Sequence, residues 1–235
     1  MSLRVLEQLT IDVAAMQLPV NVISVGAGFT YSTDGPTHQG LQDISAVATI
    51  PGMTILNSSD PVNTRAFVEV AVSSKKPHYI RIEKEKLSSF DRALINDNYL
   101  AKGYSILESG NGQNLVITSG SLSHDVLAAA KVYGANLGSK PKVLDLHQIT
   151  PLMEDYLSRE IDQSKVIITI EESYSASGLS MIISQLCMQK KWKGELYSLG
   201  VNESYVFLGS DREDLKARLN INQSGILEFM RINFQ

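Results

Sequence analysis

The sequence predicts an α/β protein made of two doubly wound blocks, each with a mostly parallel sheet covered by helices on both faces. Short apolar runs rich in valine and isoleucine alternate with longer segments of helical periodicity along the 235-residue chain. A polar, highly charged stretch at residues 83–100 interrupts this alternation once. We therefore expect a first domain at residues 1–82, a linker at 83–100 and a second domain at 101–235.

The first block begins with apolar residues at helical spacing over residues 4–16. Asp60 and Pro61 suit the N-cap and first turn of a later helix, and Pro51 ends an earlier one. A doubly wound domain rarely opens on a helix with no strand before it, so we expect this block to be the rear part of a larger domain. Its further elements are strands at 19–25, 53–58 and 78–82 and helices at 41–50 and 60–74.

The second block shows the complete alternation of four strands with helices between them. Ser121 or Ser123 suits the start of its first helix, and Gly138 suits the end of that helix. The expected strands cover 114–120, 142–149, 165–170 and 195–200, and the helices cover 121–138, 152–161, 181–189, 211–219 and 222–231.

Composition excludes several functional classes. A net charge of −4 and a pI near 5.6 leave no basic footprint for nucleic acid. No apolar stretch approaches the ~20 residues of a membrane span, and the N-terminus lacks the pattern of a signal peptide. The single cysteine, Cys187, excludes an intramolecular disulfide and has the setting of an unreactive, buried helix residue. We expect a cytoplasmic protein without membrane or nucleic-acid partners.

The stretch "STDGPTHQG" places Asp34 and His38 on one loop directly after the strand at 19–25. Ligands of such sheets bind beyond the carboxyl ends of the strands. A carboxylate near an imidazole suits acid–base work or binding of a hydroxyl group. A plain Asp-Gly-Pro turn before a helix is the alternative, and the spacing leaves both open. Lys84 follows the strand at 78–82 on the same side and suits a phosphate.

Other polar residues have structural explanations. Glu171 and Glu172 end a strand, and we expect them to cap the helix that follows. His78, His124 and His147 show no metal-ligand spacing, which indicates structural or solvated roles.

Several motifs resemble one enzyme family. The run "DGPTHQGLQDISAVATIPGMTIL", followed by "DP" and a helix, resembles the pyrimidine-binding domain of transketolases and of the related 1-deoxyxylulose-5-phosphate synthases. The segment "KPHYIRIEK" resembles the strand that ends that domain. Further on, "VLDLHQITPL", "VIITIEESYSASGLS" and "GVNESYVFLGS" resemble the transketolase C-terminal domain in the same order. The resemblance covers nearly the whole chain, and the first run is its most specific part.

The resemblance implies an enzyme that uses thiamin diphosphate and a divalent metal, Mg, to transfer a two-carbon ketol unit between sugar phosphates. It assigns sugar hydroxyl recognition to Asp34, and contact with a hydroxyl or intermediate and proton transfer to His38. Lys84 stands where the family has a phosphate-binding arginine, so the bidentate fork of arginine is lost. A second family histidine has no counterpart near Gly26, which points to different acceptor chemistry.

The family's cofactor-activating glutamate and ring-stacking aromatic residue lie upstream of the helix at 4–16, and Glu7 on that helix is misplaced for the role. We therefore expect no cofactor- or metal-binding residue in this chain and no activity of the chain alone. The expected partners are an N-terminal half or subunit with the diphosphate-binding domain, a second copy in a homodimer and a sugar phosphate. A section of a 1-deoxyxylulose-5-phosphate synthase and a non-catalytic dimerisation or sugar-binding module are the alternatives.

Overall fold

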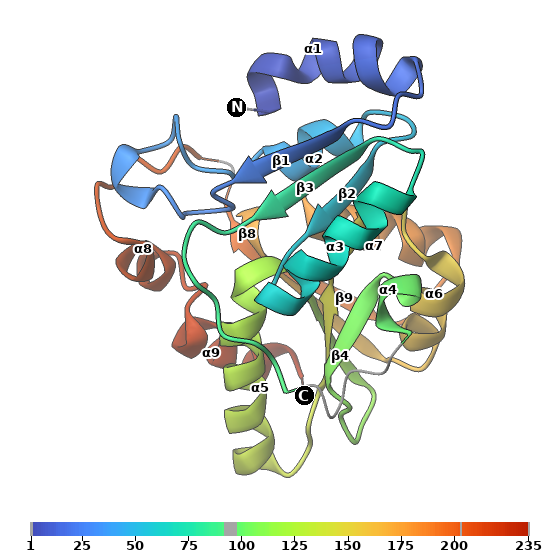
Figure 1. Cartoon of the computed structure of the whole chain (residues 1–235). Coiled ribbons are helices and arrows are strands. Elements are labelled where there is room, and N and C mark those ends of the chain that lie inside the picture. The colour runs from blue at the N-terminus through green and yellow to red at the C-terminus, as the bar shows by residue number, and fades with distance from the viewer. Residues whose placement is uncertain (1, 92–97, 203, 235) are drawn as a thin grey trace.

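The computed structural model describes residues 2–91, 98–202 and 204–234, in which the strands form two sheets (Figure 1). Residues 92–97 of the expected linker lie outside the described residues. The first sheet has the order β1 (Asn21–Val25), β3 (His78–Ile82), β2 (Thr54–Asn57), β7 (Gln148–Thr150). The second has the order β4 (Tyr104–Glu108), β6 (Lys142–Leu146), β5 (Asn114–Thr118), β8 (Val166–Tyr174), β9 (Glu195–Val201).

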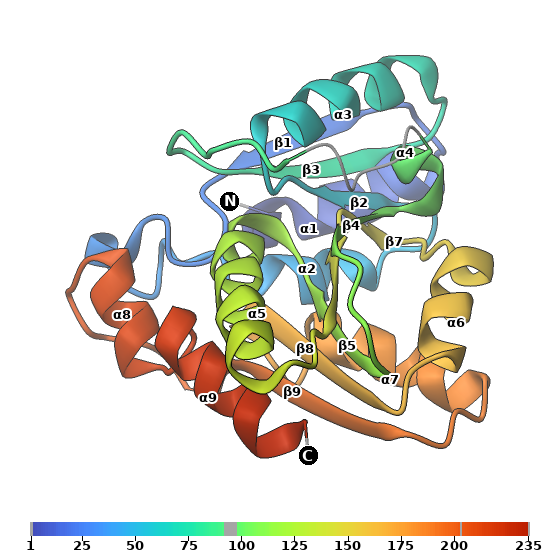
Figure 2. The ribbon, with the colours of Figure 1, turned by 90° about the horizontal axis from the view of Figure 1, so that it is seen from below.

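Helices cover both faces of each sheet, which confirms the predicted fold class (Figure 2). On the first sheet, α3 (Pro61–Ser73) lies opposite α2 (Asp43–Ala48) and the N-terminal helical segment, whose middle turn is α1 (Leu6–Gln8). On the second sheet, α5 (Ser123–Leu137) and α9 (Gln223–Asn233) lie opposite α6 (Glu154–Asp162) and α7 (Leu179–Gln189). The short helices α4 (Tyr99–Lys102) and α8 (Arg212–Arg218) complete the described part of the chain.

The two sheets share one apolar core. Buried residues of α2 such as Val47 and of α7 such as Ile183 belong to the same cluster, which also includes Ile55 of the first sheet and Ile117 of the second. All four side chains are fully buried. Because burial of apolar surface is the main favourable contribution to folding, the shared core makes the two sheets mutually dependent.

The predicted strand at 142–149 divides between the two sheets. Its first part is β6, parallel to β5, and its last part joins β7, antiparallel to β2. His147 lies at the change, buried between the rings of Phe67 (6.0 Å) and Tyr99 (5.4 Å). The apolar pattern was compatible with one strand because both parts are buried, and only tertiary packing separates them.

Other differences from the sequence prediction have similar causes. The second sheet has a fifth strand, β4, which is antiparallel to β6. It starts directly after α4, a few residues beyond the end of the expected linker. The strand β8 continues to Tyr174, beyond the predicted end at residue 170, and α7 starts at Leu179. The N-terminal segment contains a π-helical stretch at Leu9–Ala15, in which Ala14 is buried. Met16, directly after it, is 66% exposed.

Two helix ends follow the predicted signals, whereas no described side chain caps the start of α5 at Ser123. Asp60 caps α3 through Oδ1, which accepts from the Asn63 backbone N–H at 2.8 Å, and Gly138 ends α5 with φ 69°. No helix in the described residues is long and apolar enough to cross a bilayer. The boundaries 1–82, 83–100 and 101–235 stay predictions.

Replacing Asp60 should destabilise the fold more than replacing an exposed helix cap. Asp60 is buried, and its Oδ2 also accepts from the Phe90 backbone N–H at 3.2 Å. We expect Asp60→Ala to lower the free energy of unfolding by about 2 kcal/mol, because two buried donors lose their acceptor. Asp211→Ala, at the exposed cap of α8, should cost roughly half as much. Urea denaturation followed by circular dichroism measures both, and equal losses would contradict the prediction.

Candidate active site

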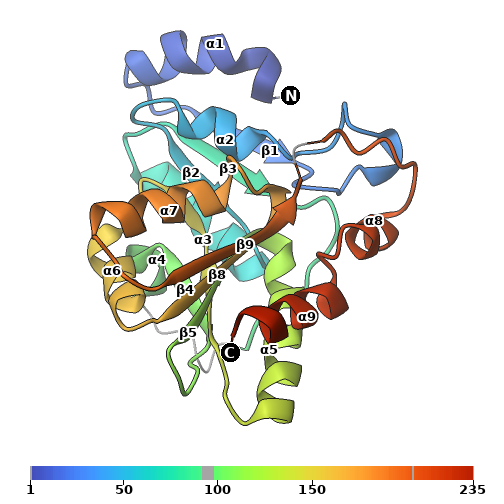
Figure 3. The ribbon, with the colours of Figure 1, turned by 180° about the vertical axis from the view of Figure 1, so that it is seen from behind.

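The candidate site is built on the loop between β1 and α2, residues 26–42, here called the β1–α2 loop. It leaves the sheet at the carboxyl end of β1, where Val25 lies beside Ile82 of β3. The backbones of Gly28 and Gly40 exchange two hydrogen bonds, at 3.2 and 2.7 Å, which close the base of the loop. The loop and the chain segment before α8 run side by side (Figures 1 and 3).

Asp34 and His38 both lie between Gly28 and Gly40 on this loop, and both side chains are exposed. Asp34 ends a short 3-10 turn at Ser32–Asp34, and Gly35 follows with φ 75°. The His38 ring contacts its neighbour: Nδ1 lies 3.0 Å from Thr37 Oγ1. In the described part of the chain, no hydrogen bond joins Asp34 to His38. The two side chains therefore share a loop but do not form an aspartate–histidine pair in this structure.

Lys84 lies at the same edge of the first sheet, two residues beyond the end of β3. Its Nζ is 5.2 Å from the centre of the Tyr31 ring, within cation–π distance. Tyr31 belongs to the β1–α2 loop, so this contact brings the predicted phosphate-binding residue beside the loop with Asp34 and His38. Lys84 is exposed, as a residue that meets an anionic ligand must be.

An arginine of the first sheet, on β3, binds the backbone at the base of the loop. Arg81 of β3 donates from Nη2 to the Gly40 carbonyl at 2.6 Å and from Nε to Asp43 Oδ2 at 2.7 Å. Tyr79 also donates to that carboxylate oxygen, at 2.9 Å. Burial alone lowers the pKa of Arg81, but the charges of Asp43 and Tyr79 outweigh it and raise the pKa. Arg81 is thus a buried, charged residue that fixes the base of the loop through its hydrogen bonds to Gly40 and Asp43.

Behind the loop lies a buried network of charged groups from both halves of the chain. Arg212 of α8 pairs with Glu83, which follows β3, and with Glu172 of β8. Its Nη2 lies 3.0 Å from Glu83 Oε1 and 2.6 Å from Glu172 Oε2, and also donates to Ser121 at 2.7 Å. A small cavity of about 20 Å³, enough for one water, adjoins Glu83, Ser121 and Glu172.

This network sets the ionisation of Glu83. Burial alone raises the pKa of the carboxyl, but Arg212, together with hydrogen bonds from Ser121 and Thr30, outweighs burial and lowers the pKa. Burial likewise lowers the pKa of Arg212 by itself, and Glu172 and Glu83 more than reverse this effect. Glu83 and Arg212 are therefore both charged in the folded protein.

The remaining sequence candidates have structural roles. Glu171 accepts from the backbone N–H groups of Leu179 (2.7 Å) and Ser180 (2.9 Å), which confirms that it caps α7. Glu172 does not cap the helix but binds Arg212. Cys187 is buried, and burial raises its pKa to about 11, as expected for an unreactive thiol.

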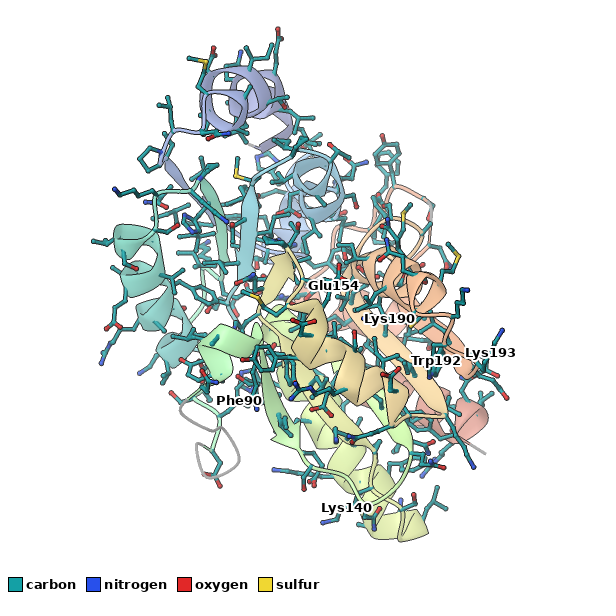
Figure 4. All side chains as sticks on the ribbon, turned by 90° about the vertical axis from the view of Figure 1, so that its right-hand side faces the viewer. Phe90, Lys140, Glu154, Lys190, Trp192 and Lys193 are labelled. Atoms are coloured by element: carbon teal, nitrogen blue, oxygen red, sulfur yellow. The ribbon has the colours of Figure 1, made fainter. Side chains whose placement is uncertain are left out.

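His78 and His124 also contact protein groups. His78 Nδ1 lies 2.9 Å from Asn21 Oδ1, and His124 Nε2 lies 3.0 Å from the Ser59 carbonyl. The His124 ring also stacks on Phe90, which is labelled in Figure 4, at 4.1 Å between ring centres. Within residues 2–91, 98–202 and 204–234, no group of three or more His, Cys, Asp or Glu side chains could hold a metal ion.

Sequence reasoning missed the role of Arg212. Its two carboxylate partners do carry a usable signal, since Glu83 follows one predicted strand and Glu172 ends another, at ligand-facing edges. The partner that neutralises them is 129 residues from Glu83 along the chain, in a short helix with no motif of its own.

The two sheets, and a polar loop held at the carboxyl end of one of them, define a pair of α/β domains. Family models describe both halves: "Transketolase, pyrimidine binding domain" matches residues 2–89 and "Transketolase, C-terminal domain" matches residues 103–226. The chain belongs to the transketolase family, which confirms the resemblance seen in the sequence.

Similar proteins include transketolase subunits and a 1-deoxy-D-xylulose-5-phosphate synthase. The chain is 26% identical to a 6-deoxy-6-sulfo-D-fructose transketolase subunit of Clostridium sp. (strain MSTE9), over 88% of this chain and 63% of that protein. It is also 26% identical to an apulose-4-phosphate transketolase subunit of Phocaeicola vulgatus (97% and 72%) and 28% identical to the 1-deoxy-D-xylulose-5-phosphate synthase of Chlorobium luteolum (97% and 36%). The chain thus spans about two thirds of the transketolase subunits and about a third of the synthase.

Solved structures share the fold. A split-gene transketolase, described as an inactive beta4 tetramer, superimposes with a TM-score of 0.83 over 98% of this chain and 72% of that one, at 21% identity. The transketolase of Campylobacter jejuni gives a TM-score of 0.81 over 99% of this chain and 34% of that one, at 19% identity.

The ionised form of Glu83 should contribute to stability at neutral pH. Because its pKa is lower in the folded than in the unfolded protein, the contribution is complete above the ordinary value of 4.5 and is lost as the pH falls through the folded value. Glu83→Gln should cost on the order of 2 kcal/mol at pH 7, and the difference from the parent should shrink as the pH falls below 4.5.

Urea denaturation at a series of pH values measures this difference. Glu228→Gln, which alters an exposed carboxylate of α9 paired with Arg231 at 3.5 Å, is the matched control and should leave the pH dependence unchanged. A Glu83→Gln loss that is independent of pH would contradict the assignment.

Proposed function

We propose that this chain is the C-terminal section or subunit of a thiamin-diphosphate-dependent, transketolase-like enzyme that transfers a two-carbon ketol unit between sugar phosphates. One observation carries the proposal. The Asp-Gly-Pro-Thr-His-Gln loop is closed at its base by Gly28 and Gly40 at the carboxyl end of β1, with Lys84 beside it. Membership of the transketolase family supports the same conclusion.

In this proposal, the exposed side chains of the loop recognise the substrate. Asp34 accepts hydrogen bonds from sugar hydroxyl groups, and a site built this way rejects analogues that lack them. His38, whose exposed ring contacts Thr37 through Nδ1, contacts a substrate hydroxyl and moves a proton there. Lys84 attracts the phosphate as a point charge.

The cofactor and its Mg belong to another part of the enzyme in this proposal. The described residues of this chain contain no group of three or more His, Cys, Asp or Glu side chains that could hold a metal ion. We propose that an N-terminal half or subunit supplies it and that these 235 residues alone do not catalyse ketol transfer. A homodimer in the cytoplasm is part of the same proposal.

Two alternatives stay open. The likeness to 1-deoxy-D-xylulose-5-phosphate synthases, up to 28% identity over 97% of the chain, fits a synthase section that takes pyruvate as donor. A non-catalytic dimerisation or sugar-binding module would keep the fold and the loop but gain no activity from any partner.

The isolated chain should be inactive, and a partner should restore activity. We expect no ketol transfer from the chain with thiamin diphosphate, magnesium, a ketose phosphate and an aldose phosphate. Transfer should appear when the diphosphate-binding subunit of the same organism is added, and a coupled assay of the new aldose phosphate measures it. Parallel reactions with pyruvate as donor test the synthase alternative. Activity of the chain alone would refute the proposal, and persistent inactivity with the subunit would favour the non-catalytic module.

In the reconstituted enzyme, Asp34→Ala and His38→Ala should each lower kcat/KM roughly a hundredfold or more, the usual range for a positioned acid–base or hydroxyl-binding group. Lys84→Ala should raise KM for phosphorylated substrates and leave kcat largely intact. Lys190→Ala is the control. Lys190 is also an exposed lysine, but it lies at the end of α7, beside Trp192 and Lys193, and not on the β1–α2 loop (Figure 4). Equal effects of Lys84→Ala and Lys190→Ala would exclude the phosphate role.

A further inference from the structure

Arg212 connects the second half of the chain to the base of the β1–α2 loop. It is the first residue of α8, and only 15% of its side chain is exposed. Its guanidinium contacts both oxygens of two carboxylates: Nε and Nη2 bind Glu172 at 2.8 and 2.6 Å, and Nη1 and Nη2 bind Glu83 at 3.1 and 3.0 Å. Such doubly bidentate geometry fixes the direction of all three side chains.

The same two carboxylates hold the start of the loop. Glu83 Oε2 accepts from the Thr30 hydroxyl at 2.5 Å, and Glu172 Oε1 accepts from the Phe29 backbone N–H at 2.9 Å. Gly28 allows the close approach, because a Cβ there would lie 2.6 Å from the carboxyl carbon of Glu172. Arg212, the carboxylates and residues 28–30 therefore form one continuous chain of contacts.

Apolar packing holds both ends of the loop against the second half of the chain. Phe29, at the start, and Leu41, at the end, are buried, and they pack in one cluster with residues of β9, α8 and the segments flanking α8. Between these ends, Gln39 donates to the Val206 carbonyl at 3.1 Å. The partners in the cluster are Val201, Val206, Leu215 and Ile221. The loop thus packs against α8 and its flanking segments. Arg212 of α8 adds ion pairs with Glu83 and Glu172 to this apolar contact.

We propose that Arg212 is a positioning residue that sets the conformation of the loop with Asp34 and His38, and the place of Lys84, through Glu83 and Glu172. The inference rests on the proposed function for the meaning of these side chains, but the contacts themselves do not depend on it. Glu83 directly precedes Lys84 in the chain, so the ion pair fixes the backbone from which Lys84 extends. Arg212 also neutralises Glu83, whose charge would otherwise oppose a phosphate at Lys84.

Loss of the guanidinium leaves two carboxylates buried side by side without their shared cation. Two other cations act on them electrostatically: Arg81 of β3 on Glu83, and Lys216 of α8 on Glu172. Arg81 is already engaged with Asp43, and Lys216 with Asp125 at 2.7 Å. The two carboxylates therefore repel each other and move apart, and the hydrogen bonds to Thr30 and Phe29 are lost with them.

The test compares Arg212→Gln with Arg218→Gln in the full chain. Arg218 lies on the same helix in an exposed pair with Asp214 at 2.8 Å, so it is a matched control. We expect amide hydrogen exchange of residues 29–40 to become roughly tenfold faster or more in Arg212→Gln, because charge-assisted hydrogen bonds are lost. Exchange in β5 and β6 should change little. The NMR signal of the His38 imidazole, assigned among four histidines, should shift.

Arg212→Lys should give partial rescue, since an ammonium supplies the charge but not the fork. It also serves as the test variant if Arg212→Gln does not fold. Unchanged exchange at residues 29–40 and an unchanged His38 signal in the Gln or Lys variant would overturn the inference, even if the melting temperature fell. These readouts need no substrate or partner protein, so a failure of ketol transfer in the reconstitution would refute the proposed function and leave this result standing.

Discussion

The structure depends on one stretch of chain that serves two sheets. Residues 142–146 lie inside the second sheet, and two residues further on the backbone pairs with β2 of the first. Asp145, fully buried at this crossing, accepts from Ser59 at 2.5 Å and Ser123 at 2.8 Å, one from each half of the chain. A buried carboxylate is tolerated only when donors satisfy it, so the two halves must be docked for the crossing to form.

This docking explains why the candidate site is firmly supported although the side chains proposed to meet the substrate are exposed. The apolar cluster around Phe29 and the ion pairs of Arg81 and Arg212 act on the same short loop from different sides. Buried ion pairs contribute little net stability once the loss of hydration is counted. Their value here is geometric, because a site that distinguishes hydroxyl groups requires a well-supported scaffold.

The sequence was sufficient for the features that local pattern determines. Buried strands such as β2 and β8 carry apolar runs. Asp34, His38 and Lys84 follow the carboxyl ends of two predicted strands, β1 and β3, which are neighbours in the sheet, so all three residues lie at the same edge. It was insufficient where tertiary contacts decide between equal local choices. The division of β6 from β7 at His147 and the pairing of Arg212 across 129 residues have no local signal.

The state of Cys187 has a practical consequence for measuring motion. It is the single thiol in 235 residues, and its burial and a pKa of about 11 keep it protonated and inaccessible at neutral pH. A cysteine introduced at the exposed Thr33 would therefore be the one site that a maleimide dye labels readily. The native chain is already suited to single-site fluorescence on the β1–α2 loop, without prior removal of any residue.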